Sequence, residues 1–175
     1  IPGPDFPTGG IVINKDELVS IYESGNGKIK LRGKVEIEPM KGGKERIVIT
    51  EIPYTMIGAN IGKFLNDVYS LVETKKTSDI VDISNQSSKA GIRIVIELKK
   101  GADAQNLCNL LYKKTRLEDT FGVNMLAVAN GKPETMGLVS VIRHNVQFQY
   151  ELATRKYTTL LKKEQDKCEI QEGLI

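Results

Sequence analysis

Residues Lys28 to Glu51 read KIKLRGKVEIEPMKGGKERIVITE, and the first half of this stretch alternates in polarity. Successive side chains of a β-strand point to opposite faces, so a period of two predicts a single half-buried strand with a charged outer face. The inward positions are Ile29, Leu31, Val35 and Ile37, and the outward positions are Lys28, Lys30, Arg32, Lys34, Glu36 and Glu38.

The second half of the stretch predicts a hairpin partner over Arg46 to Glu51, after the turn Lys41-Gly42-Gly43. A two-residue turn would place Glu38 opposite Ile47 and mix the faces of the two strands. A loop with an odd number of residues, built around glycine, keeps like with like. We therefore expect the pairs Ile37 with Ile47, Val35 with Ile49, and Glu38 with Arg46.

The chain on either side of the hairpin alternates helices with strands. Residues 1–10 are rich in proline and glycine and predict an extended lead-in, and Asp16 to Ser24 predict a short helix carrying Leu18, Val19 and Tyr22. Further on we expect a helix over Asn60–Thr74, strands over Ile80–Ile83 and Ile92–Leu98, a helix from its N-cap Asp103 to Thr115, and a strand over Phe121–Ala129.

The first of these helices carries an apolar stripe centred on Leu65, and the second turns Leu107, Leu110 and Leu111 inward. Helices that interrupt antiparallel hairpins collect on one face of the sheet. The pattern therefore predicts an α+β fold, a two-layer sandwich of antiparallel sheet and helices.

A long helix is expected after this sandwich, because neither proline nor glycine occurs from Leu138 until Gly173. Its apolar edge is thin, and about 30 helical residues would extend about 45 Å. We expect it to project toward another part of the protein. The predicted division is 1–24 for the lead-in and short helix, 25–134 for the α+β domain, and 135–175 for the long helix.

Composition excludes several classes of protein. The 175 residues are 40% hydrophobic and 27% charged, with a net charge of +3 too small to indicate a nucleic-acid partner alone. Cys108 and Cys168 lie far apart without nearby histidines, so neither a disulfide framework nor a zinc site is indicated, and a reducing cytoplasm is expected. No initiating Met is present, and we expect a piece of a longer protein without a membrane span.

The stretch Tyr22 to Lys34, YESGNGKIKLRGK, suggests a phosphate-binding loop at first sight. A P-loop requires Gly, four residues, and then Gly-Lys-Ser/Thr. Tyr22 stands where the first glycine should be, and Ile29 stands where the hydroxyl residue should be. The interpretation as a nucleotide loop therefore fails, and no combination of residues indicates a catalytic or metal site.

Several blocks together resemble the A subunit of the bacterial type IIA DNA topoisomerases, gyrase and topoisomerase IV. They occur in the family's order over essentially the whole chain. The blocks are IPGPDFPTGG at 1–10, Tyr-x-x-Gly-x-Gly at 22–27, IVITEIPY at 47–54, GIRIVIELKK at 91–100, LYKKT at 111–115, FGVNMLAVANGKP at 121–133 and EGL at 172–174.

The resemblance implies the α/β "tower" domain of that subunit, followed by the first helix of its coiled-coil arm. It implies that the catalytic tyrosine precedes this segment, so that the segment alone is inactive. The implied partners are double-stranded DNA, a second A subunit, and a B subunit. The resemblance assigns no cofactor to this segment, because it assigns Mg²⁺ and ATP to the B subunit.

This sequence departs from the family at two places. Residues 83–87 read ISNQS where the family usually has an Arg-Asp-Glu-Ser run, and the arm helix keeps only Arg143, His144 and the pair Arg155-Lys156 of the family's basic positions. We therefore do not assign to this chain the phosphate contacts or inter-domain salt bridges that the family makes at those positions. The sequence leaves open whether the parent is a gyrase or a topoisomerase IV.

The basic row of the opening stretch is the candidate DNA contact. Same-face residues of a strand lie about 6.7 Å apart, close to the spacing of phosphates along one DNA strand. Such contacts position DNA without reading its sequence. The candidate residues are Gly25, Asn26, Gly27, Lys28, Lys30, Arg32 and Lys34. The alternatives are a solvated strand face and a protein-interaction module that binds an acidic protein surface.

Overall fold

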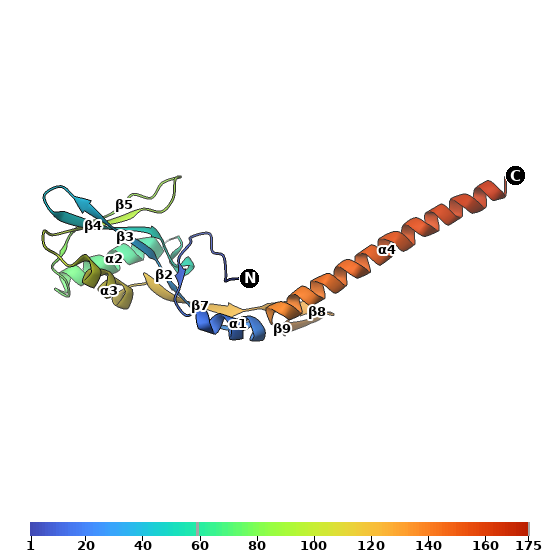
Figure 1. Cartoon of the computed structure of the whole chain (residues 1–175), viewed down its shortest axis with the longest axis horizontal. Helices are drawn as coiled ribbons and strands as arrows, with labels where there is room; N and C mark the ends of the chain where they lie inside the picture. The colour runs from blue at the N-terminus through green and yellow to red at the C-terminus, as the bar shows by residue number, and fades with distance from the viewer. Residues whose placement is uncertain (59, 175) are drawn as a thin grey trace. The chain divides into compact units, whose positions relative to one another are not determined.

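The computed structural model describes residues 1–58 and 60–174, and they form two compact units. Unit 1 comprises residues 1–18 and 27–123, and unit 2 comprises residues 19–26 and 124–175. Figure 1 shows the elements of both units. The described helices and strands confirm the predicted α+β class.

Unit 1 is built around a four-stranded antiparallel sheet in the order β3-β4-β6-β5. Its two main helices lie together on one face of this sheet, which makes two layers (Figure 1). The strands are β3 (Lys34–Met40), β4 (Lys44–Glu51), β5 (Ile80–Asn85) and β6 (Ile94–Leu98), and the helices are α2 (Asn60–Glu73) and α3 (Ala104–Lys114), with a short 3-10 helix, η2 (Tyr54–Met56), before α2.

The register of the β3–β4 hairpin is the predicted one. Ile37 pairs with Ile47, Val35 with Ile49, and Glu38 with Arg46. Met40 pairs with Lys44, so the connecting loop has the expected odd length, and both of its glycines have positive φ. Matching apolar faces therefore decided this register, as the sequence indicates.

The core lies between the sheet and the two helices. From the sheet come Ile47, Ile49, Ile94 and Ile96, and from α2 come Phe64, Val68 and Leu71. The stripe of α2 is thus centred on Phe64 and Val68, whereas Leu65 is only partly buried. In α3, Leu107 and Leu111 are buried as predicted, Leu110 is partly buried, and Asp103 caps the helix by accepting a hydrogen bond from the Asn106 N–H at 3.1 Å.

The opposite face of the four-stranded sheet carries a charged network. Glu38 accepts hydrogen bonds from Arg46 Nε at 2.7 Å and from Arg93 Nη2 at 3.3 Å. These two hydrogen bonds lower the pKa of the Glu38 carboxyl below its ordinary value of 4.5. Val48 and Val95 pair directly across β4 and β6 on this face and are fully buried.

The single strand predicted over residues 28–38 is wrong, because Gly33 divides it between two sheets. β2 (Asn26–Arg32) is the central strand of a three-stranded sheet, between β1 (Ile11–Val12) and β7 (Glu118–Asn124), whereas β3 belongs to the four-stranded sheet. The Gly33 N–H donates to the Leu117 carbonyl at 2.8 Å. A Cβ on Gly33 would lie 2.7 Å from Leu117 Cδ1 and 2.8 Å from the Glu51 carbonyl oxygen, so only glycine fits at this crossing.

The lead-in of residues 1–10 is packed against unit 1 through one aromatic side chain. Phe6 stacks on Tyr54 with a centroid distance of 5.6 Å and meets Phe121 edge-on at 5.0 Å. The Gly10 N–H donates to Glu51 Oε2 at 2.6 Å. The extended lead-in is therefore attached to the body of unit 1.

The short helix predicted near the start of the chain is present, and only some of its apolar side chains are buried. It consists of a 3-10 turn, η1 (Lys15–Glu17), followed by α1 (Leu18–Ser24). Leu18 and Ile21 are buried, but Val19 is 65% exposed. Val19 is one position from Leu18 on a helix of 3.6 residues per turn, and so it points away from the buried side.

Unit 2 also corrects the last predicted strand. Residues 121–129 form two strands, β7 and β8 (Leu126–Ala129), and β8 pairs with β9 (Lys132–Thr135) in a hairpin. The break falls at Met125, whose N–H donates to the Gly25 carbonyl at 2.8 Å and whose carbonyl accepts from the Met136 N–H at 3.1 Å. A nonlocal backbone partner therefore interrupts an apparently continuous pattern.

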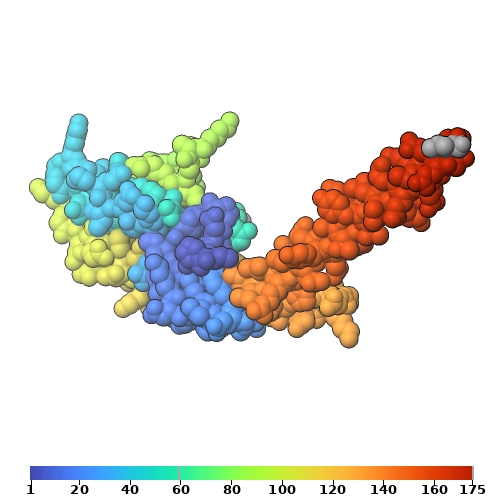
Figure 2. All heavy atoms as spheres, turned by 45° about the vertical axis from the view of Figure 1, so that its right-hand side comes forward, coloured from blue at the N-terminus to red at the C-terminus, as the bar shows by residue number. Residues whose placement is uncertain are grey.

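The helix α4 (Leu138–Glu172) has 35 residues and corresponds to about 52 Å. Its first turns have the β8–β9 hairpin beside them, and every residue from Ile142 to Leu174 is exposed (Figure 2). The long helix that the sequence predicts is confirmed. Within residues 1–58 and 60–174, no helix combines the length and apolarity that crossing a membrane requires.

Candidate nucleic-acid interface

The two sides of β2 differ sharply in exposure. Ile29 and Leu31 are each 1% exposed, whereas Lys28 and Lys30, which alternate with them along the strand, are exposed on the open side. Neither lysine ammonium has an ion-pair partner among residues 1–58 and 60–174. At strand spacing the two side chains start about 6.7 Å apart, so two free positive charges face solvent side by side.

Asn14 holds the backbone between these two lysines. Its Oδ1 accepts from the Lys30 N–H at 2.8 Å, and its Nδ2 donates to the Lys28 carbonyl at 2.9 Å. The side chain thus extends the short pairing of β1 with β2 by acting as a substitute for strand backbone. Sequence reasoning missed Asn14, and the only local signal was an asparagine between a short apolar run and a helix start.

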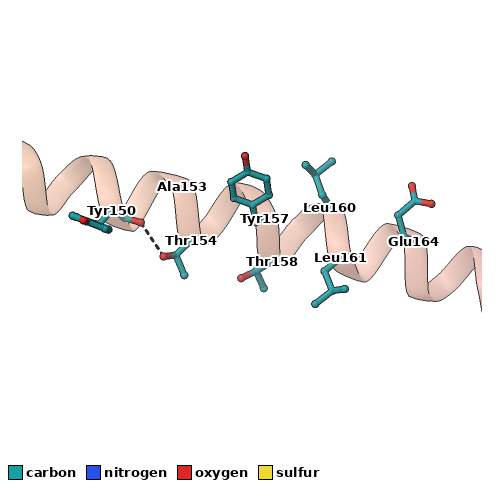
Figure 3. Close-up of a pocket in the computed structure, with 8 residues that line it drawn as sticks. All are labelled: Tyr150, Ala153, Thr154, Tyr157, Thr158, Leu160, Leu161 and Glu164. Atoms are coloured by element: carbon teal, nitrogen blue, oxygen red, sulfur yellow. Dashed lines mark hydrogen bonds between the residues drawn. The ribbon is translucent and has the colours of Figure 1, made fainter.

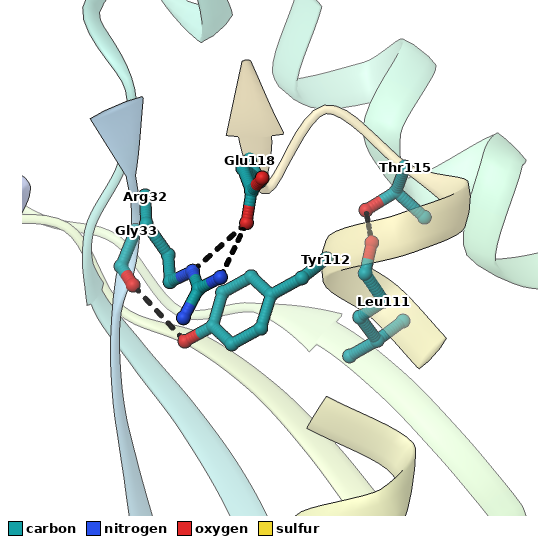
Figure 4. A network of polar contacts seen from close by, with 6 residues as sticks. All are labelled: Arg32, Gly33, Leu111, Tyr112, Thr115 and Glu118. Carbon is teal, nitrogen blue, oxygen red and sulfur yellow. Dashed lines mark hydrogen bonds and ion pairs between the residues drawn. The ribbon is translucent and has the colours of Figure 1, made fainter. Parts of the chain in front are cut away.

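Arg32 belongs to the same row but has partners inside the protein (Figure 4). Its Nε and Nη2 donate to Glu118 Oε2 at 2.9 and 2.6 Å, and its guanidinium lies 4.3 Å from the centre of the Tyr112 ring. The Tyr112 hydroxyl donates to the Gly33 carbonyl at 3.2 Å. Arg32 therefore connects β2, β7 and α3 around the glycine where the chain changes sheets.

The Arg32–Glu118 pair is partly open to solvent, with side chains 37% and 30% exposed. Solvent screening limits its contribution to at most about 1 kcal/mol. Burial raises the pKa of the Tyr112 hydroxyl above its ordinary value. The nearby Cys108 and Glu118 raise this pKa further, whereas the positive charge of Arg32 lowers it. Tyr112 therefore stays protonated and able to donate its hydrogen bond.

Lys34 lies on β3, in a different sheet from Lys28 and Lys30. Its ammonium is 3.7 Å from a Glu36 carboxylate oxygen, with both side chains about half exposed. The structure thus brings Lys28, Lys30 and Arg32 together on one strand and separates Lys34 from them. The four cations do not form one continuous row.

The glycine turn before β2 has a packing role of its own in unit 2. Gly25 has φ +72°, and a Cβ there would overlap the Met136 carbonyl. A Cβ on Gly137 would likewise overlap the Glu23 carbonyl, so the end of α1 and the start of α4 meet at two glycines. Asn26 is exposed and Gly27 is half-buried, both at the start of β2.

Apolar side chains flank the lysines on the open side of the sheet. Ile11 pairs with Arg32, and the Ile13 N–H donates to the Lys30 carbonyl at 3.1 Å, so both isoleucines share the face of the basic residues. They are 46% and 38% exposed. The surface therefore combines free charge with apolar side chains, which suits an anionic backbone and the sugars beside it.

A wide, open hollow lies elsewhere, along α4. It has a volume of about 710 Å³ and is lined only by residues of that helix, Tyr150, Ala153, Thr154, Tyr157, Thr158, Leu160, Leu161 and Glu164. Figure 3 shows these side chains spread along a single helix surface, with the Thr154 hydroxyl donating to the Tyr150 carbonyl at 2.9 Å. It is an open strip without a cluster of acid, base or nucleophile. No group of three potential metal-ligating side chains lies together in the described part of the chain.

Comparison with known proteins assigns the family. The model of the DNA gyrase/topoisomerase IV family, for its A subunit, matches residues 1–175. The chain belongs to this family. The A subunit of DNA gyrase from Clostridium acetobutylicum is 42% identical over 99% of this chain and 21% of its own length.

Relatives with both names are similar to this chain. The A subunit of DNA topoisomerase 4 from Bacillus subtilis is 43% identical over 100% of the chain and 21% of its own length. The A subunit of DNA gyrase from Staphylococcus epidermidis is 40% identical over 99% of the chain and 19% of its own length. The chain thus spans about a fifth of the length of these family members, and relatives with either name match it at about 40% identity.

Proposed function

We propose that this chain is part of the A subunit of a type IIA DNA topoisomerase, which breaks and rejoins DNA to pass one duplex through another. Its family membership and the names of its relatives support this proposal. The complete enzyme works in the cytoplasm as an A2B2 complex, with two copies of the A subunit and two copies of a B subunit that supplies Mg²⁺ and ATP hydrolysis. The segment itself contributes no catalytic residue and is inactive alone.

Within that enzyme, the segment positions the duplex that is cut, through contacts to its phosphate backbone. The observation that carries this proposal is the pair Lys28 and Lys30, which are exposed and have no ion-pair partner among the described residues, on a strand whose backbone Asn14 holds. Two ammonium groups at this spacing match successive phosphates of one strand. The contacts position DNA without reading its sequence.

Arg32 contributes to this surface mainly by orienting β2, because Glu118 neutralises its charge. Lys34 contributes less, because it lies in another sheet and Glu36 is close to its ammonium. The backbone at Gly25, Asn26 and Gly27 approaches the duplex at the start of the strand. The phosphate contacts proper are therefore expected at Lys28 and Lys30.

A salt titration of duplex binding tests the proposal in the full-length protein. Each phosphate neutralised by a lysine contributes about 0.9 to the slope of log K against log salt. We expect Lys28→Ala and Lys30→Ala each to reduce this slope by about one and to weaken binding equally for unrelated sequences. Both side chains are exposed, so thermal stability should not change.

Lys162→Ala is the matched control, since Lys162 is an exposed lysine of α4 far along the chain from β2. It should leave the slope unchanged. If the Lys28 and Lys30 variants behave like this control, the basic strand does not contact DNA. The alternative function, an interaction module for an acidic protein surface, would then be favoured.

We further propose the division 1–24, 25–134 and 135–175 into lead-in, tower domain and the start of a coiled-coil arm. The exposed apolar side chains along α4, among them Phe148, Leu152 and Leu160, support an arm that packs against other helices. Hydrogen exchange on the isolated 175-residue chain tests this proposal. The outer half of α4 should exchange much faster than α2, and equal protection would contradict it.

A further inference from the structure

Three connections of unit 1 meet at one end of the four-stranded sheet. β3 ends and β4 begins there, β5 begins there after α2, and β6 ends there before α3. Figure 1 shows these connections together at the left-hand end of the sheet. Each contributes two lysines, which together we call the lysine cluster: Lys41 and Lys44, Lys75 and Lys76, and Lys99 and Lys100.

All six side chains of the lysine cluster are exposed. In the part of the chain that the structure describes, none of them forms an ion pair or a side-chain hydrogen bond. Acidic residues at these ends are fewer, namely Glu45, Glu73, Asp79 and Asp103, and the Asp103 carboxylate is used by Asn106. This end of the sheet therefore carries more exposed lysines than carboxylates, and its six ammonium groups are free of ion pairs within the described residues.

The turns in this region pack closely enough to form a common surface. A Cβ on Gly43 would lie 3.7 Å from Lys100 Cε, so the side chain of one connection reaches the turn of another. A hollow of about 370 Å³ lies between them, lined by Pro39, Met40, Gly43, Lys44, Glu45, Lys99, Gly101 and Ala102. Lys44 and Lys99, which belong to two of the three connections, thus border one shallow depression.

Lys75 occupies a backbone conformation that lysine rarely adopts. Its φ is +55°, directly after the last turn of α2, where glycine or asparagine is usual. A side chain with a Cβ is strained in this left-handed region. The Lys75 N–H donates to the Val72 carbonyl and the Lys76 N–H to the Leu71 carbonyl, both at 3.0 Å, so this conformation closes the C-terminal end of α2 and leaves both lysines exposed.

We infer that the lysine cluster is a second phosphate-backbone contact, which holds a duplex where it extends beyond the segment bound at β2. This inference rests on the proposed function, because it assumes that the same DNA lies on Lys28 and Lys30. The ligand is the sugar-phosphate backbone of double-stranded DNA, bound without sequence preference. The cluster therefore extends the DNA path from the three-stranded sheet to the far end of the four-stranded sheet.

The composition of this end favours DNA over an acidic protein as the partner. A protein interface has a core of aromatic and apolar side chains surrounded by a polar rim. Large hydrophobic side chains that are exposed are scarce at this end of the sheet. In the described part of the chain, the three connections and the strand residues directly beside them include one, Val81 at the start of β5. Flexible lysines without apolar anchors match a regular row of phosphates and provide little for a folded partner.

The chain length between the two contacts sets the length of DNA required. Lys30 and Lys41 are 11 positions apart, which corresponds to at most about 40 Å of extended chain. At about 3.4 Å per base pair, this upper limit corresponds to about 12 base pairs. A duplex that only covers β2 should not reach the cluster, and one lengthened by about 12 base pairs at each end should reach it.

The experiment compares these two duplexes in salt titrations with the full-length protein. The double variants Lys41→Ala/Lys44→Ala and Lys99→Ala/Lys100→Ala should each weaken binding of the long duplex about 5- to 10-fold and reduce its salt slope by one to two. Neither should change binding of the short duplex. Lys162→Ala/Lys163→Ala on α4 removes the same charge and should change neither.

Lys75→Gly provides a variant that cannot weaken binding by unfolding the protein, because glycine relieves the left-handed strain. It should weaken binding of the long duplex while leaving the unfolding midpoint equal or higher. Long-duplex binding that equals the wild type in all three cluster variants would overturn the inference. Loss of the Lys28→Ala and Lys30→Ala effect on the short duplex would instead overturn the proposed function, so the two failures are distinguishable.

Discussion

Replacing Gly33 by alanine should destabilise the protein although it removes no atom. The new Cβ would lie 2.7 Å from Leu117 Cδ1 and 2.8 Å from the Glu51 carbonyl oxygen. Leu117 is fully buried, and the Glu51 carbonyl belongs to β4, so neither neighbour can move aside freely. Overpacking at such a site costs about 1–3 kcal/mol.

A second cost comes from the hydrogen bonds at the same residue. Its N–H donates to the Leu117 carbonyl at 2.8 Å, and its carbonyl accepts from the Tyr112 hydroxyl at 3.2 Å. Displacing the backbone weakens both, at about 1 kcal/mol for a typical bond. We therefore expect Gly33→Ala to lower the free energy of unfolding by about 2–4 kcal/mol.

The matched control is Gly62→Ala, the same substitution in the first turn of α2. A Cβ there meets nothing within 4 Å, and alanine is the better helix former. Gly62→Ala should therefore raise the free energy of unfolding by about 0.5–1 kcal/mol. The two substitutions should have opposite signs.

Urea titrations followed by circular dichroism measure both changes. Hydrogen exchange of the β4 amides reports the same quantity for unit 1, without a contribution from α4. A cost below about 0.5 kcal/mol for Gly33→Ala would refute the steric reasoning, because it would mean that the chain can change sheets with a side chain at this position.

Three further outcomes are expected. Phe64→Ala should cost about 3–5 kcal/mol and Leu65→Ala clearly less, since Phe64 is 1% exposed and Leu65 only partly buried; equal costs in urea titrations would place the buried face of α2 elsewhere. Burial raises the pKa of the Cys108 thiol to about 11, so iodoacetamide at pH 8 should modify the exposed Cys168 and leave Cys108 unmodified in mass spectra. Rapid modification of both cysteines would contradict the burial of Cys108. In an NMR titration the pKa of the Glu38 carboxyl should lie below 4.5, and it should rise in the Arg46→Ala variant. The stability that this pair contributes should be present above about pH 4.5 and should disappear as the pH falls through the folded-state pKa. An unchanged Glu38 pKa in the variant would show that Arg46 does not stabilise the carboxylate.

Local pattern predicted the elements whose partners are close in the sequence. The register of β3 with β4 follows from matching apolar faces across a loop of odd length, and Asp103 caps α3 as its position indicates. The long α4 follows from the absence of proline and glycine over its 35 residues. In each case the deciding interactions lie within one element or one hairpin.

Nonlocal contacts decided where the elements break and which faces they bury. Polarity continues to alternate through Gly33, so nothing local signals the change of sheet, which depends on Leu117 and Glu51. The strand pattern of residues 121–129 is likewise interrupted at Met125, because its N–H donates to the carbonyl of Gly25, 100 positions earlier in the chain. Periodicity reports which side of a strand is buried, but not against which neighbour.

The candidate site divides in the same way. Alternation in the sequence by itself predicted that Lys28 and Lys30 are exposed on one face of a strand above buried Ile29 and Leu31. Only the tertiary structure decided that Arg32 is neutralised, because its partner Glu118 lies 86 positions away along the chain. Only the structure likewise placed the lysines of three separate connections at one end of a sheet. Charge pairing depends on distance in space, and the fold rather than the order of residues sets that distance.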